Sequence, residues 1–256
     1  MILAQSQITS YLARVGVNQA VSPDLSGLNQ LLYAHLTHVP FEALDVWATS
    51  ACPSLELEDL YHKIVEDRRG GYCFELNTLF RVLLNSLGFD AYQVIASLLD
   101  EVGNAAPPAH NVIICVIGGK KYLVDVGFGG PVPLEALALF EHSEADFRLA
   151  QKDGFWYLYH EERPVIRFRD IPAQVIDFIP LNFYVSQKPD IHFRHRVFVN
   201  QRQPDGRIFS LRGDEFTIRS DNGSESISVT SMEQIKKILD TYFGIKEKTV
   251  TFLDHH

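Results

Sequence analysis

The spacing of hydrophobic residues changes about a third of the way along the chain. Up to about residue 90, apolar residues recur every three or four positions, which is typical of one face of a helix. The pattern predicts helices over residues 7–17, residues 22–40, and from Cys73 or Phe74 to about Leu87. Gly88 follows the third of these stretches, where a helix commonly ends.

Beyond this point the spacing is that of β-strands. Short runs rich in β-branched and aromatic residues are separated by Gly, Pro and Asp. They predict strands at residues 91–99, 111–117, 121–126, 147–151, 154–160 and 164–170. After a proline-rich stretch, further strands are predicted at residues 192–201, 206–213, 215–219 and 226–230. The chain then closes with an amphipathic helix that begins after Ser231, with Gln234 in capping-box position.

This order of elements predicts an α+β fold in three parts. Residues 1–90 form a helical region, residues 91–190 a β-rich meander or barrel, and residues 191–256 strands with a final helix. At 256 residues, the length fits either one large domain or two to three smaller lobes.

Composition narrows the range of partners. The chain is 46% hydrophobic and 21% charged, which is ordinary for a globular protein. Its formal net charge of −9 argues against nucleic-acid binding, and no long apolar run predicts a membrane span or a secretory signal. Cys52, Cys73 and Cys115 are widely spaced, so neither a disulfide framework nor a zinc site is indicated, and a cytoplasmic location is expected.

One cysteine stands where a nucleophile would be activated. Cys73 follows Gly70 and Gly71 and opens the third predicted helix. Unpaired N–H groups and the helix dipole favour the thiolate at such a position, and the thiolate is the nucleophilic form. Taken alone, however, a cysteine at a helix start is more often a small buried residue. For Cys52, in a loop, and Cys115, in an apolar strand, we expect only a structural role.

A base and an orienting acid are predicted on one hairpin. Gly118-Gly119 suits a two-residue turn, which places Val112 opposite Asp125. His110 then shares a face with Asp125 as a diagonal neighbour. A four-residue loop keeps this arrangement, whereas a three-residue loop places the two on opposite faces. An acid beside a histidine fixes the tautomer and stabilises the imidazolium, although structural His–Asp pairs are also common.

Two further features bear on ligands. Residues Gly127, Phe128, Gly129 and Gly130 directly follow the predicted acid, and bare backbone there allows close approach of an extended ligand. Such a loop alone is a weak signal. His192 and His195 lie three apart on a predicted strand, which points them to opposite faces, so no metal site is expected.

These motifs resemble one family. RGGYCFELN (69–77), HVPFEALDVW (38–47), the His110 strand, VDVGFGG (124–130) and NFYVSQKPDIHFRHRVF (182–198) occur in the order seen in arylamine N-acetyltransferases. The resemblance covers nearly the whole chain. It implies a helical bundle, a β-barrel and an α/β lid, with a cysteine-protease-like triad of Cys73, His110 and Asp125.

The resemblance also implies supporting residues and a reaction. Glu42 and Arg69 match a charged pair beneath the active-site loop, and residues 127–130 match the border of the cleft for acetyl-CoA and substrate. Acetyl-CoA would be a co-substrate, with no permanently bound cofactor. Acetyl would pass through a Cys73 thioester to arylamines, arylhydrazines or N-hydroxyarylamines in ping-pong order, a reaction of xenobiotic metabolism.

The ligand contacts are less well defined. Because arylamines are flat and apolar, we expect the pocket to include the aromatic residues Phe41, Tyr72, Phe128 and Phe193. No basic cluster for the coenzyme phosphates stands out, and the C-terminal part looks short for a bacterial member. The candidate residues for binding the coenzyme phosphates are Arg194, Arg196, Arg202, Lys120 and Lys121.

Three other functions remain open. A relative on the same fold closes macrolactams with a carrier-bound polyketide as acyl donor. The same triad also serves peptide hydrolysis in cysteine peptidases. In a non-catalytic protein, Cys73 would be structural, and its replacement would change no activity. The acceptor amine, the acyl-chain preference and the oligomeric state are not indicated by the sequence.

Overall fold

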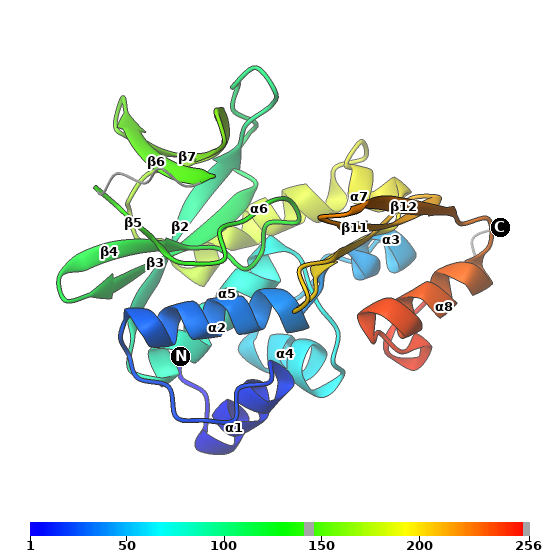
Figure 1. The fold of residues 1–256 in the computed structure, drawn as a ribbon, viewed down its shortest axis with the longest axis horizontal. Helices are drawn as coiled ribbons and strands as arrows, with labels where there is room; N and C mark the ends of the chain where they lie inside the picture. The colour runs from blue at the N-terminus through cyan, green and yellow to red at the C-terminus, as the bar shows by residue number, and fades with distance from the viewer. Residues whose placement is uncertain (141–145, 253–256) are drawn as a thin grey trace.

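The computed structural model describes residues 1–140 and 146–252. Figure 1 shows the N-terminal helices below a strongly curved sheet, and a second sheet with the last long helix to one side. The chain is therefore a mixed helix and sheet structure, as the order of predicted elements indicated. Within these residues, no helix is long and apolar enough to cross a membrane.

The N-terminal part is helical. Its elements are α1 (Gln5–Arg14), α2 (Leu25–His38), α3 (Leu44–Thr49), α4 (Leu57–Tyr61), the π-helical turn η1 (His62–Glu66) and α5 (Cys73–Ser86). The side chain of Asp24 caps α2 by accepting a hydrogen bond from the Gly27 N–H at 2.9 Å. The three long helices match the predicted stretches, whereas α3, α4 and η1 were not predicted.

Helix α5 lies at the centre of the molecule. Of its 14 residues, 11 are buried, including polar residues, so it is enclosed on nearly every side rather than amphipathic. It packs against strands β2 and β3 of the curved sheet and joins two hydrophobic clusters. The first residue of this helix, Cys73, is thereby held where the helical part meets the sheet.

The middle of the chain forms an antiparallel seven-stranded sheet. Its strand order is β5 (Leu137–Ala138), β4 (Lys120–Val124), β3 (His110–Ile117), β2 (Asp90–Leu98), β8 (Arg163–Phe168), β7 (Phe155–His160) and β6 (Phe147–Lys152). The edge strands β5 and β6 approach each other, so the sheet is nearly closed into a barrel around its own apolar cluster.

The hairpin between β3 and β4 has the predicted register. Ile117 pairs with Lys120, and Gly118 and Gly119 adopt φ values of 58° and 79°. Positive φ at both positions is what a two-residue turn of this kind requires, and glycine adopts it without strain. The pairing that places His110 and Asp125 on one face is thus confirmed.

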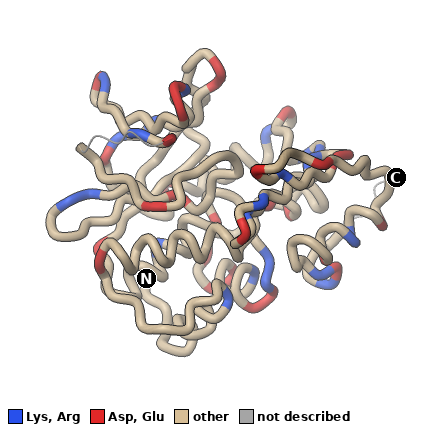
Figure 2. The backbone as a smooth tube through the Cα atoms, viewed as in Figure 1, with Lys and Arg blue, Asp and Glu red and all other residues tan. Residues whose placement is uncertain are grey.

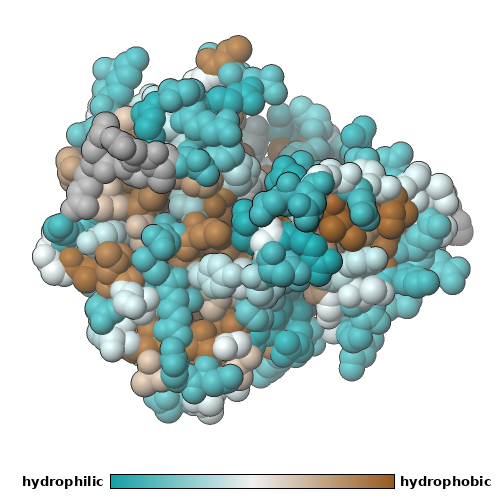
Figure 3. Space-filling model, in the orientation of Figure 1, coloured by the Kyte–Doolittle hydropathy of each residue, from teal (hydrophilic) through white to brown (hydrophobic). Residues whose placement is uncertain are grey.

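A second antiparallel sheet has the order β1 (Phe41–Glu42), β9 (Phe198–Arg202), β10 (Ile208–Arg212), β11 (Glu215–Ser220) and β12 (Gly223–Ser228). Helix α8 (Met232–Phe243) and the 3-10 turn η2 (Glu247–Thr249) follow it. Strand β1 belongs to the N-terminal part in sequence, so this sheet ties both ends of the chain together. In the view of Figure 3, hydrophobic residues reach the surface over this sheet and over the N-terminal helices.

Two stretches differ from the sequence prediction. The proline-rich stretch contains helix α6 (Val175–Gln187), which includes Pro180 and buries Phe178 and Val185. A proline inside a helix normally argues against one, and here the burial of the apolar face outweighs that preference. The strand predicted from residue 192 was wrong at its start: α7 (His192–His195) is a helical turn packed near α3, and the strand begins at Phe198.

Candidate active site

Cys73 lies at the first position of helix α5 and is only 6% exposed. The N–H groups of Cys73 and Phe74 belong to the first turn of the helix. Such N–H groups have no carbonyl acceptor within the helix. The Tyr72 N–H donates to Glu75 Oε2 at 3.0 Å, which closes the start of the helix. The thiol therefore sits at the positive end of a well-formed helix.

The two glycines before Cys73 are required by close packing. A Cβ at Gly70 would lie 1.9 Å from the carbonyl oxygen of Pro40, and one at Gly71 would lie 2.9 Å from Glu75 Cβ. Neither has a positive φ. Both positions therefore need glycine because neighbouring protein atoms lie too close for a side chain.

A buried charge network lies beneath this loop. Arg69 pairs with Glu42 at 2.8 Å and with Asp45 at 2.8 Å, and Lys63 pairs with Asp45 at 2.7 Å and with Glu75 at 2.6 Å. Burial by itself lowers the pKa of Arg69, but the carboxylates of Glu42 and Asp45 outweigh it and raise that pKa above its usual range. The structure forms the Glu42–Arg69 pair that the resemblance implies and adds Asp45 and Lys63, which the sequence analysis did not identify.

His110 and Asp125 meet beside Cys73. His110 begins β3 and Asp125 directly follows β4; His110 Nε2 lies 2.6 Å from Asp125 Oδ2, and both residues are buried. Burial by itself lowers the pKa of His110. The charge and hydrogen bond of Asp125, together with Cys73, raise it to about 10. The imidazole is therefore positively charged at neutral pH.

The orientation of the His110 ring determines which neighbour each of its two nitrogens faces. Because Nε2 faces Asp125, Nδ1 is the nitrogen left for Cys73. The thiol lies 3.8 Å from the carbonyl oxygen of Ala109, the residue before His110. A cysteine, a histidine and a carboxylate are thus gathered from α5, β3 and the end of β4, in the arrangement required for an activated nucleophile.

Asn77 holds Asp125 in place and was not identified from the sequence. Its Nδ2 donates to Asp125 Oδ1 at 2.9 Å and to the Asn111 carbonyl at 2.8 Å, while its Oδ1 accepts from the Val126 N–H at 3.0 Å. The signal was present, because Asn77 follows Cys73 by four residues and so lies on the same helix face.

Gly127 packs directly on Cys73. Its N–H donates to Asp125 Oδ1 at 2.8 Å, and a Cβ there would lie 2.7 Å from Cys73 Cα and 2.8 Å from Asn77 Nδ2. The glycine therefore allows the end of β4 to lie against the start of α5. Gly127 therefore affects how Cys73 and Asp125 are placed, and not only how closely a ligand can approach.

Replacing Gly127 with alanine is expected to lower kcat/KM at least about 100-fold, because the Cβ contacts backbone and must displace Cys73 or Asp125. A steady-state assay of the acetyl transfer that the sequence resemblance implies measures the loss. Gly154→Ala is the control, since Gly154 lies outside the cleft and a Cβ there meets nothing within 4 Å in the described chain. Equal activity of the two variants would contradict the role given to Gly127.

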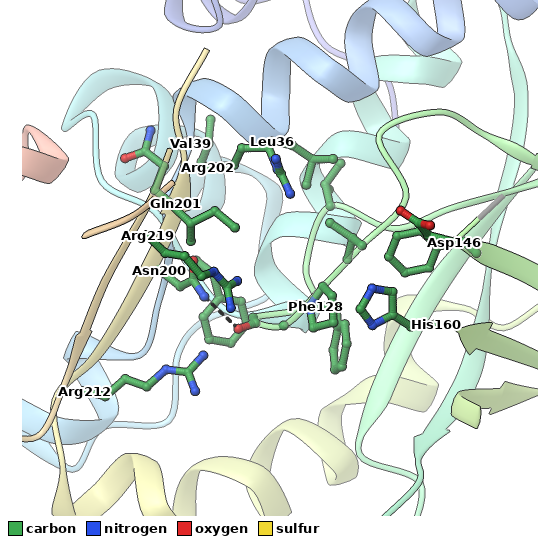
Figure 4. A pocket seen from close by; sticks show the side chains of 18 residues that line it. Leu36, Val39, Phe128, Asp146, His160, Asn200, Gln201, Arg202, Arg212 and Arg219 are labelled. Atoms are coloured by element: carbon green, nitrogen blue, oxygen red, sulfur yellow. Dashed lines mark hydrogen bonds between the residues drawn. The ribbon is translucent and has the colours of Figure 1, made fainter. Parts of the chain in front are cut away.

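A cleft of about 500 Å³ opens next to the triad. Figure 4 shows arginines of the C-terminal sheet on one side, and Asp146 and His160 of the barrel-like sheet on the other. Phe128 connects the cleft to the triad, with its ring 5.7 Å from that of His110. Gly129 and Gly130 line it as well, and Asn200 Nδ2 donates to the Gly129 carbonyl at 3.1 Å.

Three arginines line this cleft: Arg202, Arg212 and Arg219. Burial, followed by the charge of Arg219, lowers the pKa of Arg212. None of the three forms an ion pair within residues 1–140 and 146–252. Figure 2 shows basic and acidic residues interspersed along the chain, so the positive character of the cleft is local and independent of net charge.

Of the basic residues suggested by the sequence, only Arg202 lines the cleft. Lys121 pairs with Asp170 at 2.6 Å, and Arg194 donates to the Ser186 carbonyl at 3.4 Å. Neither Arg212 nor Arg219 was predicted, because strand pairing decides where they lie. Ile208 pairs with both Arg202 and Arg219, and Arg212 lies four residues further along β10 on the same face.

The predicted aromatic residues occupy different environments. Phe41 and Phe128 line the cleft. Phe193 packs 6.0 Å from Phe41, whereas Tyr72 is fully buried and its hydroxyl donates to Asn182. The assignment of these four residues to the substrate pocket stays a prediction. Across the part of the chain that the structure describes, no group of three or more His, Cys, Asp or Glu is placed to hold a metal.

Comparison with known proteins now defines the class. A family described as N-acetyltransferase matches residues 24–250. The chain is therefore an enzyme of the N-acetyltransferase class. It is 33% identical to an arylamine N-acetyltransferase of Mycolicibacterium smegmatis over 92% of this chain and 90% of that protein. It is 29% identical to the arylamine N-acetyltransferase / N-hydroxyarylamine O-acetyltransferase of Salmonella typhimurium over 94% of this chain and 89% of that protein.

Solved structures agree. The Salmonella typhimurium arylamine N-acetyltransferase has a TM-score of 0.88 at 27% identity, over 99% of this chain and 95% of that one. The Mycobacterium marinum enzyme in complex with CoA has a TM-score of 0.84 at 27% identity, over 93% and 92% of the two chains. The chain belongs to the arylamine N-acetyltransferase family.

Proposed function

We propose that this enzyme transfers acetyl from acetyl-CoA to arylamines, arylhydrazines or N-hydroxyarylamines through a thioester on Cys73. The observation that carries the proposal is the buried His110–Asp125 pair beside Cys73 at the mouth of a cationic cleft. The named activities of the relatives and the CoA bound to the Mycobacterium marinum neighbour support it.

In the first half-reaction, the Cys73 thiolate attacks the thioester carbonyl of acetyl-CoA. The His110 imidazolium, held by Asp125, gives its proton to the departing CoA sulfur as the carbon–sulfur bond breaks. The N–H groups at the start of α5 stabilise the oxyanion of the tetrahedral intermediate. The products are acetyl-Cys73, free CoA and neutral His110.

In the second half-reaction, the amine attacks the acetyl carbon of the thioester. His110 takes the proton that the amine loses, and the bond from carbon to Cys73 breaks. This step restores the thiolate and the imidazolium. Acetylation removes the Cys73 interaction that helps to raise the pKa of His110, so that pKa falls and more of the ring is in the neutral form that can accept the proton.

The three arginines of the cleft are proposed to hold the coenzyme phosphates, because guanidinium groups bind phosphate oxygens with paired hydrogen bonds. Residues 127–130 would border the pantetheine chain, and Phe41, Tyr72, Phe128 and Phe193 the acceptor. Residues 1–90, 91–190 and 191–256 would act as bundle, barrel and lid. A reducing cytoplasm suits the free thiol of Cys73.

Replacing Arg219 with glutamine is expected to raise the KM for acetyl-CoA about tenfold or more, since a hydrogen bond to a charged group contributes about 1.5–3 kcal/mol. The KM for S-acetylpantetheine, which lacks the phosphates, should stay the same. Arg207→Gln is the matched control, because Arg207 pairs with Asp205 outside the cleft. Equal effects on both donors would argue against phosphate binding.

The first experiment is the intact mass of the protein after incubation with acetyl-CoA, before and after addition of 4-aminobenzoate or an arylhydrazine. We expect one acetyl group on Cys73, followed by its loss to the amine. Iodoacetamide labelling reports in parallel whether Cys73 is reactive. A reactive Cys73 without an acetyl adduct would reject acetyl-CoA as donor and favour another acyl donor, such as a carrier-bound polyketide.

A further inference from the structure

A second cavity lies apart from the cleft. It has a volume of about 430 Å³ and shares no lining residue with the cleft. Its walls come from the end of β2, from β8, and from residues 169–173, which lead into α6. This volume is within the usual range of sites for small organic ligands.

The walls of this cavity are largely apolar. Ile95, Phe155, Ile171 and Pro172 contribute carbon surface, and Ile171 is 61% exposed. Exposed apolar side chains around a concave site are unusual on a water-facing surface and mark a place where an apolar group binds. The cavity therefore suits a ligand with a hydrocarbon or aromatic body.

Two positive charges gather at one wall. The guanidinium groups of Arg167 and Arg169 lie 4.7 and 4.2 Å from the centre of the Phe155 ring. In the described ranges, neither arginine has an ion-pair partner. The one acid of the lining, Asp177, already accepts the Gln174 N–H at 2.8 Å as a cap of α6. The arginines are thus free to bind an anion.

A serine hydroxyl also lines the cavity. Ser97 is 94% buried, at 6% exposed, and its side chain makes no hydrogen bond within the described part of the chain. The hydroxyl oxygen itself is not enclosed by protein, so it is accessible from the cavity. A ligand oxygen that enters the cavity can therefore accept a hydrogen bond from Ser97.

We propose that this cavity binds a small apolar carboxylate, with its carboxylate on Arg167 and Arg169, its body against Ile95 and Phe155, and Ser97 as a further donor. A carboxylate fits two neighbouring guanidinium groups through paired hydrogen bonds. The apolar walls disfavour a polyphosphate, which would lose hydration there without replacement. The site is separate from the acetyl-transfer cleft and does not rest on the proposed reaction.

The test is isothermal titration of the intact enzyme with 3-phenylpropionate and with its neutral isostere 3-phenylpropionamide. We expect the acid to bind at least about tenfold more tightly, because its charge is paired with guanidinium groups. The double variant Arg167→Gln, Arg169→Gln should remove that difference, and Ser97→Ala should weaken acid binding several-fold. Arg163→Gln on the same strand is the control, since Arg163 faces Glu101 at 3.8 Å outside the cavity.

A second measurement locates the probe. Saturating CoA and the Arg219→Gln variant should leave the affinity for 3-phenylpropionate unchanged, and amide NMR shifts should concentrate at residues 95–97 and 167–173. Equal binding of acid and amide would overturn the proposal, as would displacement of the acid by CoA. Loss of binding in Arg163→Gln equal to that in the double variant would overturn it as well. Thermal unfolding of each variant confirms that it is folded.

Discussion

Replacing Cys73 with serine is expected to lower kcat/KM for acetyl transfer by at least about 10⁴-fold, comparable to removing the nucleophile of other catalytic triads. His110, with its pKa raised to about 10, is positively charged at neutral pH and cannot remove a proton from a serine hydroxyl. In the proposed mechanism the attacking group is a thiolate, which needs no base. The variant should also gain no acetyl group in the intact-mass measurement.

Cys52→Ser is the control for this result. Cys52 is the exposed free thiol, and it accepts a hydrogen bond from Asn182 Nδ2 at 3.2 Å. Its replacement should leave kcat/KM unchanged. Iodoacetamide should label Cys73 faster than Cys52 near neutral pH. Acetyl transfer by Cys73→Ser at the wild-type rate would reject the thioester mechanism.

Replacing Asp125 with asparagine is expected to lower kcat/KM about 10³- to 10⁴-fold, as loss of the orienting acid does in a comparable triad. The carboxylate accepts from His110 through one oxygen and from Asn77 and Gly127 through the other. An amide cannot accept at both ends. It also removes the charge that holds the ring protonated.

The pH dependence of this variant follows from the direction of the shift. In the wild type, His110 carries its proton until the pH rises through about 10. Without the carboxylate, burial dominates and lowers the pKa of His110, so the proton is lost at a lower pH. NMR titration of the ring should show this downward shift. Asp170→Asn is the control, because Asp170 pairs with Lys121 away from the triad.

Much of the fold could be predicted from local patterns. The three long N-terminal helices, the β3–β4 hairpin and most strands of both sheets follow from hydrophobic spacing and from glycines at turns. Short elements such as α3 and α7 could not be predicted, because contacts from distant parts of the chain stabilise them. Helix α6 was missed because Pro180 argues locally against a helix that burial of Phe178 and Val185 stabilises.

For the candidate site, the sequence by itself indicated that His110 and Asp125 share a face, because Gly118-Gly119 suits a two-residue turn. The structure has that turn, with both glycines at positive φ. It also predicted a helix from Cys73 or Phe74, because the apolar spacing begins there, and the structure starts the helix at Cys73. Only the tertiary structure decided that Cys73 lies beside the His110–Asp125 pair. The start of α5 lies against the end of β4. At Gly127 this contact is so close that a Cβ would collide with Cys73. The grouping of Arg202, Arg212 and Arg219 also depends on strand pairing, which no local pattern encodes.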